Sequence, residues 1–417
     1  MHQADVIVLG AGIIGVSTAM HLCQRGLDVI LVDRRYPGEE TSFGNAGVVE
    51  RNGFAPHPFP SNPITFLQIL FGQSSAVSLD LKALPQLLPW LAAYKRYGSQ
   101  RHVQDYARIM GRMRELVLEE HAKLSELANS QRFYRKSGWL HLFKSGPGFS
   151  AGDTERYFAR VFGVDYRELD EAGIAALERD LTTTGYSGLF WPQTESVSNP
   201  GAVTEAIWRA FVREGGKFFS TDATRLKRVR GQWMLPCDRG ELVGRHVVVA
   251  LGPWSGEFCK QFGDPFPLAV KRGHHLHFRP RSGASLSRPV VDMSNGFVLT
   301  PMEKGIRLTT GVDFSHRDAP PNLAQMALAE RRARAIFPLG EAVEEEPWCG
   351  SRPCLPDSLP VLGKSQKVAN LWYNFGHGHS GFTLGPLSGR LMSELILGQT
   401  PAVDVEPFSP ARFGSQT

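Results

Sequence analysis

Hydrophobic runs at the start of the chain predict a strand, a helix and a second strand in close succession. Val6 to Leu9 is a continuous aliphatic run, which is typical of a strand buried on both faces of a sheet. The helix is expected to end before Gly26, and residues 29–32 predict the next strand. Two strands joined through a helix are the opening unit of a doubly wound α/β domain.

Farther along the chain, helical and strand patterns are mixed without strict alternation. Apolar residues recur at helical spacing from Tyr106 to Leu127, and Asn199 followed by Pro200 predicts a helix start with a cap and a first-turn proline. A last helix is expected from about Ser380 to Gly398. Strands are expected at 139–143, 241–250, 274–278, 297–300 and 306–310. This mixture predicts a Rossmann-like α/β domain with a second α+β domain, built on a mostly antiparallel sheet.

Composition and charge narrow the class of protein. The 417 residues are 42% apolar, and 46 basic against 41 acidic residues leave a net charge of +5, too weak an excess to indicate a nucleic-acid partner. Five scattered cysteines without a C-x-x-C pair argue against a disulfide framework or a zinc site, and no metal is expected. Without a leader or an apolar run of membrane-spanning length, we expect a cytoplasmic protein, with peripheral attachment to the inner face of the membrane left open.

The turn after the first strand carries the strongest motif. Gly10-Ala11-Gly12-Ile13-Ile14-Gly15 matches G-x-G-x-x-G between a strand and a helix, and Asp33 follows at the end of the second strand. The glycines permit the turn and the approach of a pyrophosphate, and the acidic residue accepts a ribose hydroxyl. The sequence therefore predicts dinucleotide binding. The motif does not by itself separate NAD from FAD.

Several other segments carry a resemblance to a known family. They are residues 6–33, Glu40 to Gly47 (ETSFGNAG), 247–255 (VVVALGPWS), 348–357 (WCGSRPCLPD), 376–383 (GHGHSGFT) and 408–413 (FSPARF). Together they resemble the D-amino-acid oxidase superfamily of flavoproteins, with the bacterial D-amino-acid dehydrogenases of the small-subunit type as the nearest likeness. The likeness runs nearly end to end and is weakest from about 60 to 190.

This resemblance implies noncovalent FAD, because the position that carries covalent flavin in related sarcosine oxidases falls nearer Gly350 than Cys354. It implies an FAD-binding domain of residues 1–60, 191–260 and 345–417, and a substrate domain of residues 61–190 and 261–344. The residues that it assigns to the cofactor are Gly10, Gly12, Ile13, Ile14, Gly15, Asp33, Arg34, Thr41, Ser42, Asn45, Ala46, Gly47, Gly252, Trp254, Gly378, Gly381, Phe382 and Thr383.

Arg352 and His377 are the candidate catalytic residues. The guanidinium of Arg352 matches a carboxylate with a planar fork of donors, and the resemblance gives it the substrate carboxylate. An ion pair with one of Glu344 to Glu346 is the structural alternative. His377 is expected to shape the flavin environment and not to act as a base, since hydride transfer requires only the neutral amine of the substrate.

The implied reaction is oxidation of a D-amino acid to an imino acid, followed by hydrolysis to a 2-oxo acid and ammonia, with electrons passed to a quinone or another carrier. A cyclic or secondary amino acid, such as D-hydroxyproline, D-proline, sarcosine, glycine or an opine, is an alternative substrate. Service as the flavin-binding subunit of a larger complex is an alternative role. Amphipathic stretches at Ile64 to Phe71 and Leu81 to Tyr97, with Lys95 and Arg96, fit either peripheral membrane contact or burial. The sequence leaves the oligomeric state open.

Overall fold

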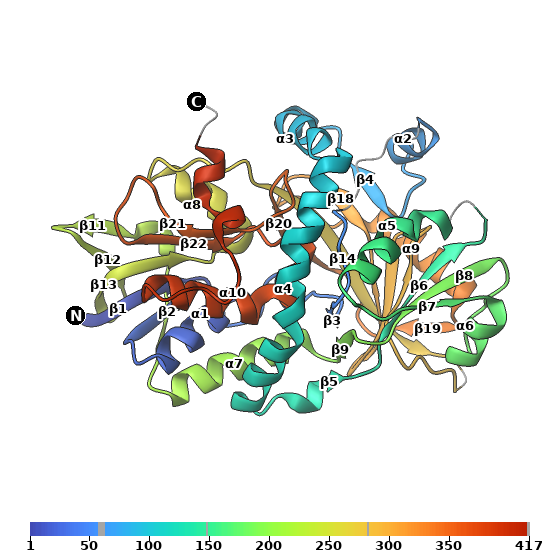
Figure 1. Cartoon of the computed structure of the whole chain (residues 1–417), viewed down its shortest axis with the longest axis horizontal. Coiled ribbons are helices and arrows are strands. Elements are labelled where there is room, and N and C mark those ends of the chain that lie inside the picture. The colour runs from blue at the N-terminus through green and yellow to red at the C-terminus, as the bar shows by residue number, and fades with distance from the viewer. Residues whose placement is uncertain (57–62, 147–148, 282, 415–417) are drawn as a thin grey trace.

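Two lobes and a long helix between them make up the molecule (Figure 1). The computed structural model describes residues 1–56, 63–146, 149–281 and 283–414. One lobe is built on an eight-stranded sheet and the other on an eleven-stranded sheet. The helix α4 (Gln100–Leu127) passes between them, and the first strand and the last helix belong to the same lobe (Figure 1).

The eight-stranded sheet has a parallel centre. β1 (His2–Leu9) lies between β2 (Val29–Asp33) and β13 (Gly240–Val249), and β10 (Lys217–Ser220) extends the parallel set beyond β2. The end of β13 also pairs in parallel with β22 (Leu371–Phe375). Antiparallel strands complete the sheet: β11 (Lys227–Val229), β12 (Gln232–Cys237) and β21 (Val361–Lys364).

Helices cover both faces of this sheet. One face packs against α1 (Ile13–Gln24), α7 (Pro200–Arg213), α10 (Gly381–Ile396) and the apolar side of α4. α8 (Ser255–Lys260) contributes to the core on the other face. α1 and α10 approach closely because Gly389 has no side chain, and a Cβ there would lie 2.6 Å from the carbonyl carbon of Ser17. This close packing fixes α1, whose first turn follows the glycine motif.

The eleven-stranded sheet is mostly antiparallel. At its centre β14 (Ala269–Pro280) pairs with four neighbours, and only the pairs β15–β6 and β18–β4 are parallel. Its strands are β4 (Val77–Leu79), β6 (Trp139–Lys144), β7 (Arg167–Leu169), β8 (Tyr186–Trp191), β14, β15 (Val290–Asp292), β16 (Phe297–Met302), β17 (Gly305–Thr309), β18 (Val312–Phe314), β19 (Leu339–Ala342) and β20 (Trp348–Cys354).

Smaller elements surround this second sheet. Its helices are α2 (Pro63–Leu70), α3 (Leu84–Arg96), α5 (Asp153–Val161), α6 (Glu171–Leu177) and α9 (Leu323–Ile336). A three-stranded sheet of β3 (Val48–Val49), β9 (Glu195–Val197) and β5 (Tyr134–Arg135) joins the lobes. The predicted fold class is confirmed, a Rossmann-like α/β unit with an α+β partner on a mostly antiparallel sheet.

The local signals in the sequence are also borne out. Asn199 Oδ1 accepts the backbone N–H of Ala202 at 3.0 Å, so the predicted cap begins α7. Gly398 has a φ of +67° just after α10, as expected of a C-terminal glycine. The apolar stripe of α4 is buried except at Leu127, which is 40% exposed because the helix ends there.

The sheets divide the chain differently from the expected boundaries at two places. β20, which we assigned with residues 345–417 to the nucleotide-binding domain, pairs with β14 in the eleven-stranded sheet. α4, assigned with residues 61–190 to the substrate domain, packs its apolar side onto α1, α7 and α10. β20 therefore belongs to the lobe of the eleven-stranded sheet, and α4 packs against the lobe of the eight-stranded sheet.

Candidate active site

The glycine turn after β1 combines two kinds of glycine. Gly10 has a φ of +104°, and a Cβ there would lie 2.3 Å from the carbonyl oxygen of Ala250; a Cβ at Gly15 would lie 1.7 Å from the carbonyl oxygen of Gly10. A side chain at either position would collide with the backbone, so the fold of the turn itself requires both glycines. Gly12 has an ordinary φ of −72°, and the nearest atom to its Cβ would be Ser42 Oγ at 3.2 Å. Because that hydroxyl is the one atom within 4 Å among the described residues, the turn is less crowded at Gly12 than at Gly10 or Gly15, which leaves room for the approach of a phosphate.

Asp33 stands beside this turn, at the end of β2. Its Oδ2 accepts the backbone N–H of Ala11 at 2.7 Å, and its Oδ1 accepts that of Arg35 at 3.0 Å. Arg34, next in the chain, lies 4.4 Å from the ring centroid of Trp254. The structure therefore brings Arg34 and Trp254, both predicted from the sequence, to one side of the turn. Gly252 begins the short helical turn η4 (Gly252–Trp254), which carries that tryptophan.

The loop from Thr41 to Gly47 connects the turn to the second sheet. Ser42 Oγ accepts the backbone N–H of Ile13 at 2.9 Å, and Thr41 Oγ1 donates to the carbonyl oxygen of Ser351 at 2.9 Å. Asn45 Oδ1 accepts the N–H of Gly47 at 2.8 Å. The Ala46 carbonyl accepts from Thr300 Oγ1 at 2.8 Å. The hydrogen bonds of this loop therefore connect the nucleotide turn at Ile13 with β20 at Ser351 and with β16 at Thr300.

Arg307 on β17 fixes the same loop and was missed by sequence reasoning. It is buried, and its Nη1 donates to the carbonyl oxygens of Phe43 at 3.1 Å and Asn45 at 2.6 Å. Its Nε donates to His277 Nε2 at 3.0 Å, and His277 Nδ1 lies 2.7 Å from Glu344 Oε1. Burial, and next the charge of Arg307, lower the pKa of His277 to about 4, so its neutral ring links arginine to glutamate. The one available signal for Arg307 was a charged residue inside an otherwise apolar strand.

Arg352 lies on β20 and faces β14. Its Nη1 donates to the carbonyl oxygens of Arg272 at 3.2 Å and Gly311 at 3.3 Å, and the guanidinium lies where a Cβ of Gly273 would be, 2.4 Å from both Nη atoms. No carboxylate of the described residues forms an ion pair with it. Of the alternative partners, Glu344 instead pairs with His277 and, at 3.7 Å, with Lys304.

The aromatic ring of Trp348 covers the same face of β20. A Cβ at Gly44 would lie 1.7 Å from this ring, and one at Gly350 would lie 2.0 Å from it. The ring also stacks on His275, with centroids 4.9 Å apart. Trp348 thus packs between the loop of residues 41–47 and the strand that carries Arg352, and both glycines are needed to admit it.

The glycine-rich segment before α10 forms the other side of the site. His377 is buried, its Nε2 lies 2.9 Å from Ser388 Oγ, and burial lowers its pKa to about 3, so its ring is neutral. Thr383 Oγ1 donates to the carbonyl oxygen of Val48 at 3.2 Å and accepts the N–H of Glu50 at 3.3 Å. Gly381 and Phe382 begin α10, and Phe382 is buried in the hydrophobic core between α10 and its neighbouring helices. Gly378, with a φ of +57°, lines a cavity together with His377.

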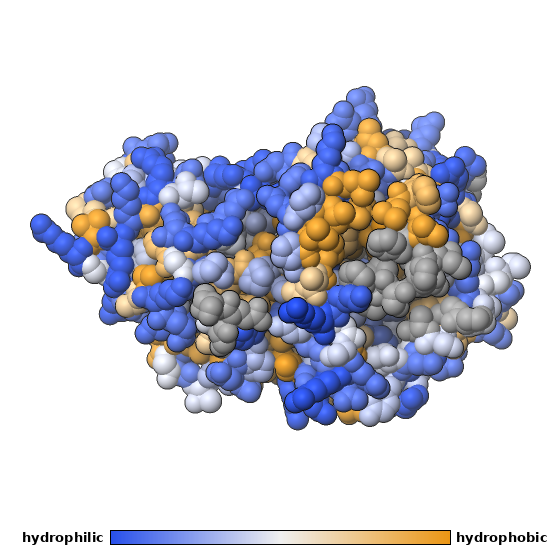
Figure 2. All heavy atoms as spheres, turned by 90° about the horizontal axis from the view of Figure 1, so that it is seen from above, coloured by the Kyte–Doolittle hydropathy of each residue, from blue (hydrophilic) through white to orange (hydrophobic). Residues whose placement is uncertain are grey.

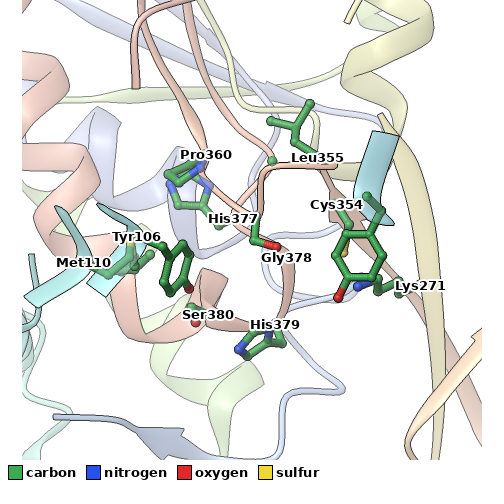
Figure 3. A pocket seen from close by; sticks show the side chains of 14 residues that line it. Tyr106, Met110, Lys271, Cys354, Leu355, Pro360, His377, Gly378, His379 and Ser380 are labelled. Atoms are coloured by element: carbon green, nitrogen blue, oxygen red, sulfur yellow. The ribbon is translucent and has the colours of Figure 1, made fainter. Parts of the chain in front are cut away.

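That cavity lies between the glycine-rich segment, α4, α3 and the adjoining ends of β14 and β20. Figure 3 shows Tyr106, His379 and Lys271 arranged around the loop at Gly378, with Cys354 on the same side of the loop as Lys271. The cavity is the point where elements of both lobes meet, and no metal-binding cluster of three acidic, histidine or cysteine side chains occurs in the part of the chain that the structure describes.

Comparison with known proteins identifies the family. The model of the family described as "DAO: FAD dependent oxidoreductase" matches residues 5–395. The D-amino-acid oxidase of Bradyrhizobium diazoefficiens is 29% identical over 98% of both chains. Among solved structures, glycine oxidase from Geobacillus kaustophilus aligns with a TM-score of 0.76 at 21% identity over 99% of both chains. L-proline dehydrogenase from P. horikoshii aligns with a TM-score of 0.76 at 18% identity over 99% of this chain and 98% of that one.

Proposed function

The chain belongs to the DAO family of FAD-dependent oxidoreductases, and from this premise we propose that it oxidises a D-amino acid to the imino acid, which water then hydrolyses to a 2-oxo acid and ammonia. The cofactor is FAD, which fits a glycine turn without a side chain at Gly12 and the acceptor position of Asp33. The observation that carries the proposal is the guanidinium of Arg352, which lies over Gly273, opposite the cavity-lining Lys271, and has no carboxylate partner among the described residues.

In this proposal Arg352 orients the substrate. Its fork holds the α-carboxylate by two charge-assisted hydrogen bonds, which leaves the α-carbon and the amine at fixed positions. Bound FAD supplies the acceptor of the hydride. Arg307 holds the loop of Asn45 and Gly47 in place, and the neutral His377 adds no charge near the reacting atoms. The helix start at Gly381 would stabilise developing negative charge through the positive end of its dipole.

Anaerobic reduction of the holoenzyme tests this function. We expect D-amino acids to bleach the visible flavin absorbance within seconds to minutes, and their L-enantiomers to leave it unchanged. Proline, sarcosine and glycine belong in the same series, since the structural neighbours include a glycine oxidase and an L-proline dehydrogenase. Bleaching by L-amino acids alone, or by none of these compounds, would contradict the proposal. Turnover by the isolated chain would argue against a role only as a subunit.

We further propose that a quinone or a carrier accepts the electrons. The support is the resemblance of residues 348–357 and 376–383 to the dehydrogenase branch of the family. The reduced holoenzyme, mixed with either air or a soluble quinone, should be reoxidised faster by the quinone. Faster reoxidation by oxygen would assign the chain to the oxidases.

An apolar surface over α2 and α3 supports peripheral contact with an anionic lipid surface (Figure 2). No described helix is both long and apolar enough to span a bilayer. The patch comprises large side chains that are 41–73% exposed: Leu67, Leu70, Phe71, Leu81 and Leu88. Between residues 61 and 104 Asp80 is the only acidic residue, against Lys82, Lys95, Arg96 and Arg101. Exposed apolar side chains in a segment with an excess of basic residues match an anionic membrane surface.

Sedimentation with vesicles tests this contact. We expect the protein to sediment with vesicles that contain anionic lipid and to remain in solution with neutral ones. The double variant F71S/L88S should bind at least several-fold more weakly, because it removes two of the exposed apolar side chains. The matched control is V161S/V212S, which changes two exposed valines elsewhere on the molecule. Equal sedimentation of the two double variants would contradict the assignment of this surface.

A further inference from the structure

Lys271 is a buried cation of the candidate active site, and it lies directly opposite the half-buried Arg352. The two residues are register partners across the antiparallel strands β14 and β20, so their side chains project from the same face of the sheet. Cβ atoms of such partners are about 4.5–5.5 Å apart. Like charges at directly opposed positions destabilise a sheet. An arrangement of this kind therefore calls for a compensating negative charge.

The described residues do not provide that charge. Lys271 is only 9% exposed, and none of its three N–H donors has an acceptor or a carboxylate partner among them. Cys354, the next residue of β20 on this face, is a thiol whose pKa is raised by burial and is therefore neutral. Burial and then the charge of Arg352 lower the pKa of Lys271, which agrees with a cation that lacks a counter-ion.

The other buried cations of the chain show the contrast. Arg114 pairs with Glu50 at 3.0 Å, and Arg272, adjacent to Lys271 but on the opposite face of β14, pairs with Asp313 at 3.6 Å. Arg307 is connected through His277 to Glu344. Burial of an unpaired charge is expensive, and such groups concentrate at binding sites. Among the described residues, the buried Lys271 and its half-buried register partner Arg352 have no such partner, and both belong to the candidate active site.

Aromatic rings hold the Lys271 ammonium in position without neutralising it. Its Nζ lies 4.1 Å from the ring centroid of Tyr94, 5.3 Å from that of Trp90 and 5.9 Å from that of Phe314. Trp90 is itself fixed, because its Nε1 donates to the carbonyl oxygen of Cys354 at 3.2 Å. The side chain also lines the cavity below Gly378 (Figure 3). The ammonium is thus oriented in advance toward a ligand.

We propose that Lys271 binds a second carboxylate of the substrate, so that the enzyme prefers amino acids with two carboxylates. The inference rests on the proposed function, in which Arg352 binds the first carboxylate. A substrate with two negative charges compensates both cations. A neutral amino acid leaves one of them buried and unpaired.

Pairs of substrates that differ in charge but not in shape test this preference. For the enantiomer that is turned over, we expect kcat/KM to be 10- to 100-fold higher for aspartate than for asparagine, or for glutamate than for glutamine. Lys271→Met should reduce this ratio at least 10-fold and leave the amides within about threefold of wild type. Lys271→Arg, which keeps the charge, should retain the preference. Lys95→Met, on the exposed side of α3, is the matched control.

A binding measurement gives a readout that does not depend on turnover. Succinate and butyrate, neither of which is an amino acid, are titrated into the holoenzyme while the flavin spectrum is followed. We expect the wild type to bind succinate at least 10-fold more tightly than butyrate, and Lys271→Met to bind both alike. Equal affinities in the wild type, or an equal loss for acidic and neutral substrates in the variant, would overturn the inference. If no amino acid reduces the flavin, the proposed function fails, whereas the anion titration still tests Lys271.

Discussion

Replacement of Arg352 by alanine is expected to lower kcat/KM for the amino-acid substrate by about 10²- to 10⁴-fold. Removal of one partner of a desolvated charge pair costs about 3–5 kcal/mol, and each 1.36 kcal/mol is a factor of ten in rate. The fall in kcat/KM should come mainly from a higher KM, because the carboxylate is bound in both the ground state and the transition state. Steady-state kinetics with the substrate found by anaerobic bleaching measure it.

Measurements of stability and two control variants separate this effect from unfolding. Arg352 makes hydrogen bonds only to backbone carbonyls and faces the like charge of Lys271, so its removal should leave the melting temperature and the bound FAD unchanged. Arg352→Lys keeps the charge without the planar fork and should give an intermediate loss. Arg331→Ala, at an exposed position of α9, should have no effect. Activity of Arg352→Ala within threefold of wild type would refute the assignment.

The second large effect is expected at Gly12. A valine there should give a folded, colourless protein with an affinity for FAD at least about 100-fold lower. The side chain would project beside Ser42 at the start of α1 and separate the pyrophosphate from the helix N–H groups. Loss of two charge-assisted hydrogen bonds of about 1.5–3 kcal/mol each accounts for this magnitude. FAD reconstitution, followed by absorbance, and circular dichroism measure the two properties.

The adjacent glycines provide the contrast for this experiment. Gly12 has an ordinary backbone conformation, so its valine variant should melt near the temperature of the wild-type apoprotein. Gly15→Ala should instead destabilise the fold, because its Cβ would lie 1.7 Å from the carbonyl oxygen of Gly10. If Gly12→Val takes up FAD with wild-type affinity, the turn does not contact the pyrophosphate as proposed.

The cofactor turn shows what local sequence can predict. The spacing of Gly10, Gly12 and Gly15 and the position of Asp33 depend on one strand, one helix and the next strand, all within 33 residues. Short segments of this kind place their groups through local conformational preferences, so their pattern in the sequence is informative. The helix cap at Asn199 was predictable for the same reason.

The substrate side of the site was less accessible to sequence reasoning. Arg352 was identified by resemblance, but Lys271 is 81 residues away and only the register of β14 with β20 brings the two together. The connection from Arg307 through His277 to Glu344 likewise joins three different strands or their ends. Register between distant strands depends on the packing of the whole sheet, which spacing along the chain does not reveal.

By itself, the sequence determined that this protein has a dinucleotide-binding turn, a doubly wound start and an unusual arginine in a Gly-x-Arg-Pro segment, because each is encoded within a few adjacent residues. Only the tertiary structure decided that this arginine has no carboxylate partner among the described residues, that a buried lysine faces it, and that a neutral histidine links Arg307 to Glu344. The physical reason is that burial and charge compensation are properties of side chains gathered from distant strands, and these come into contact only when the two sheets fold.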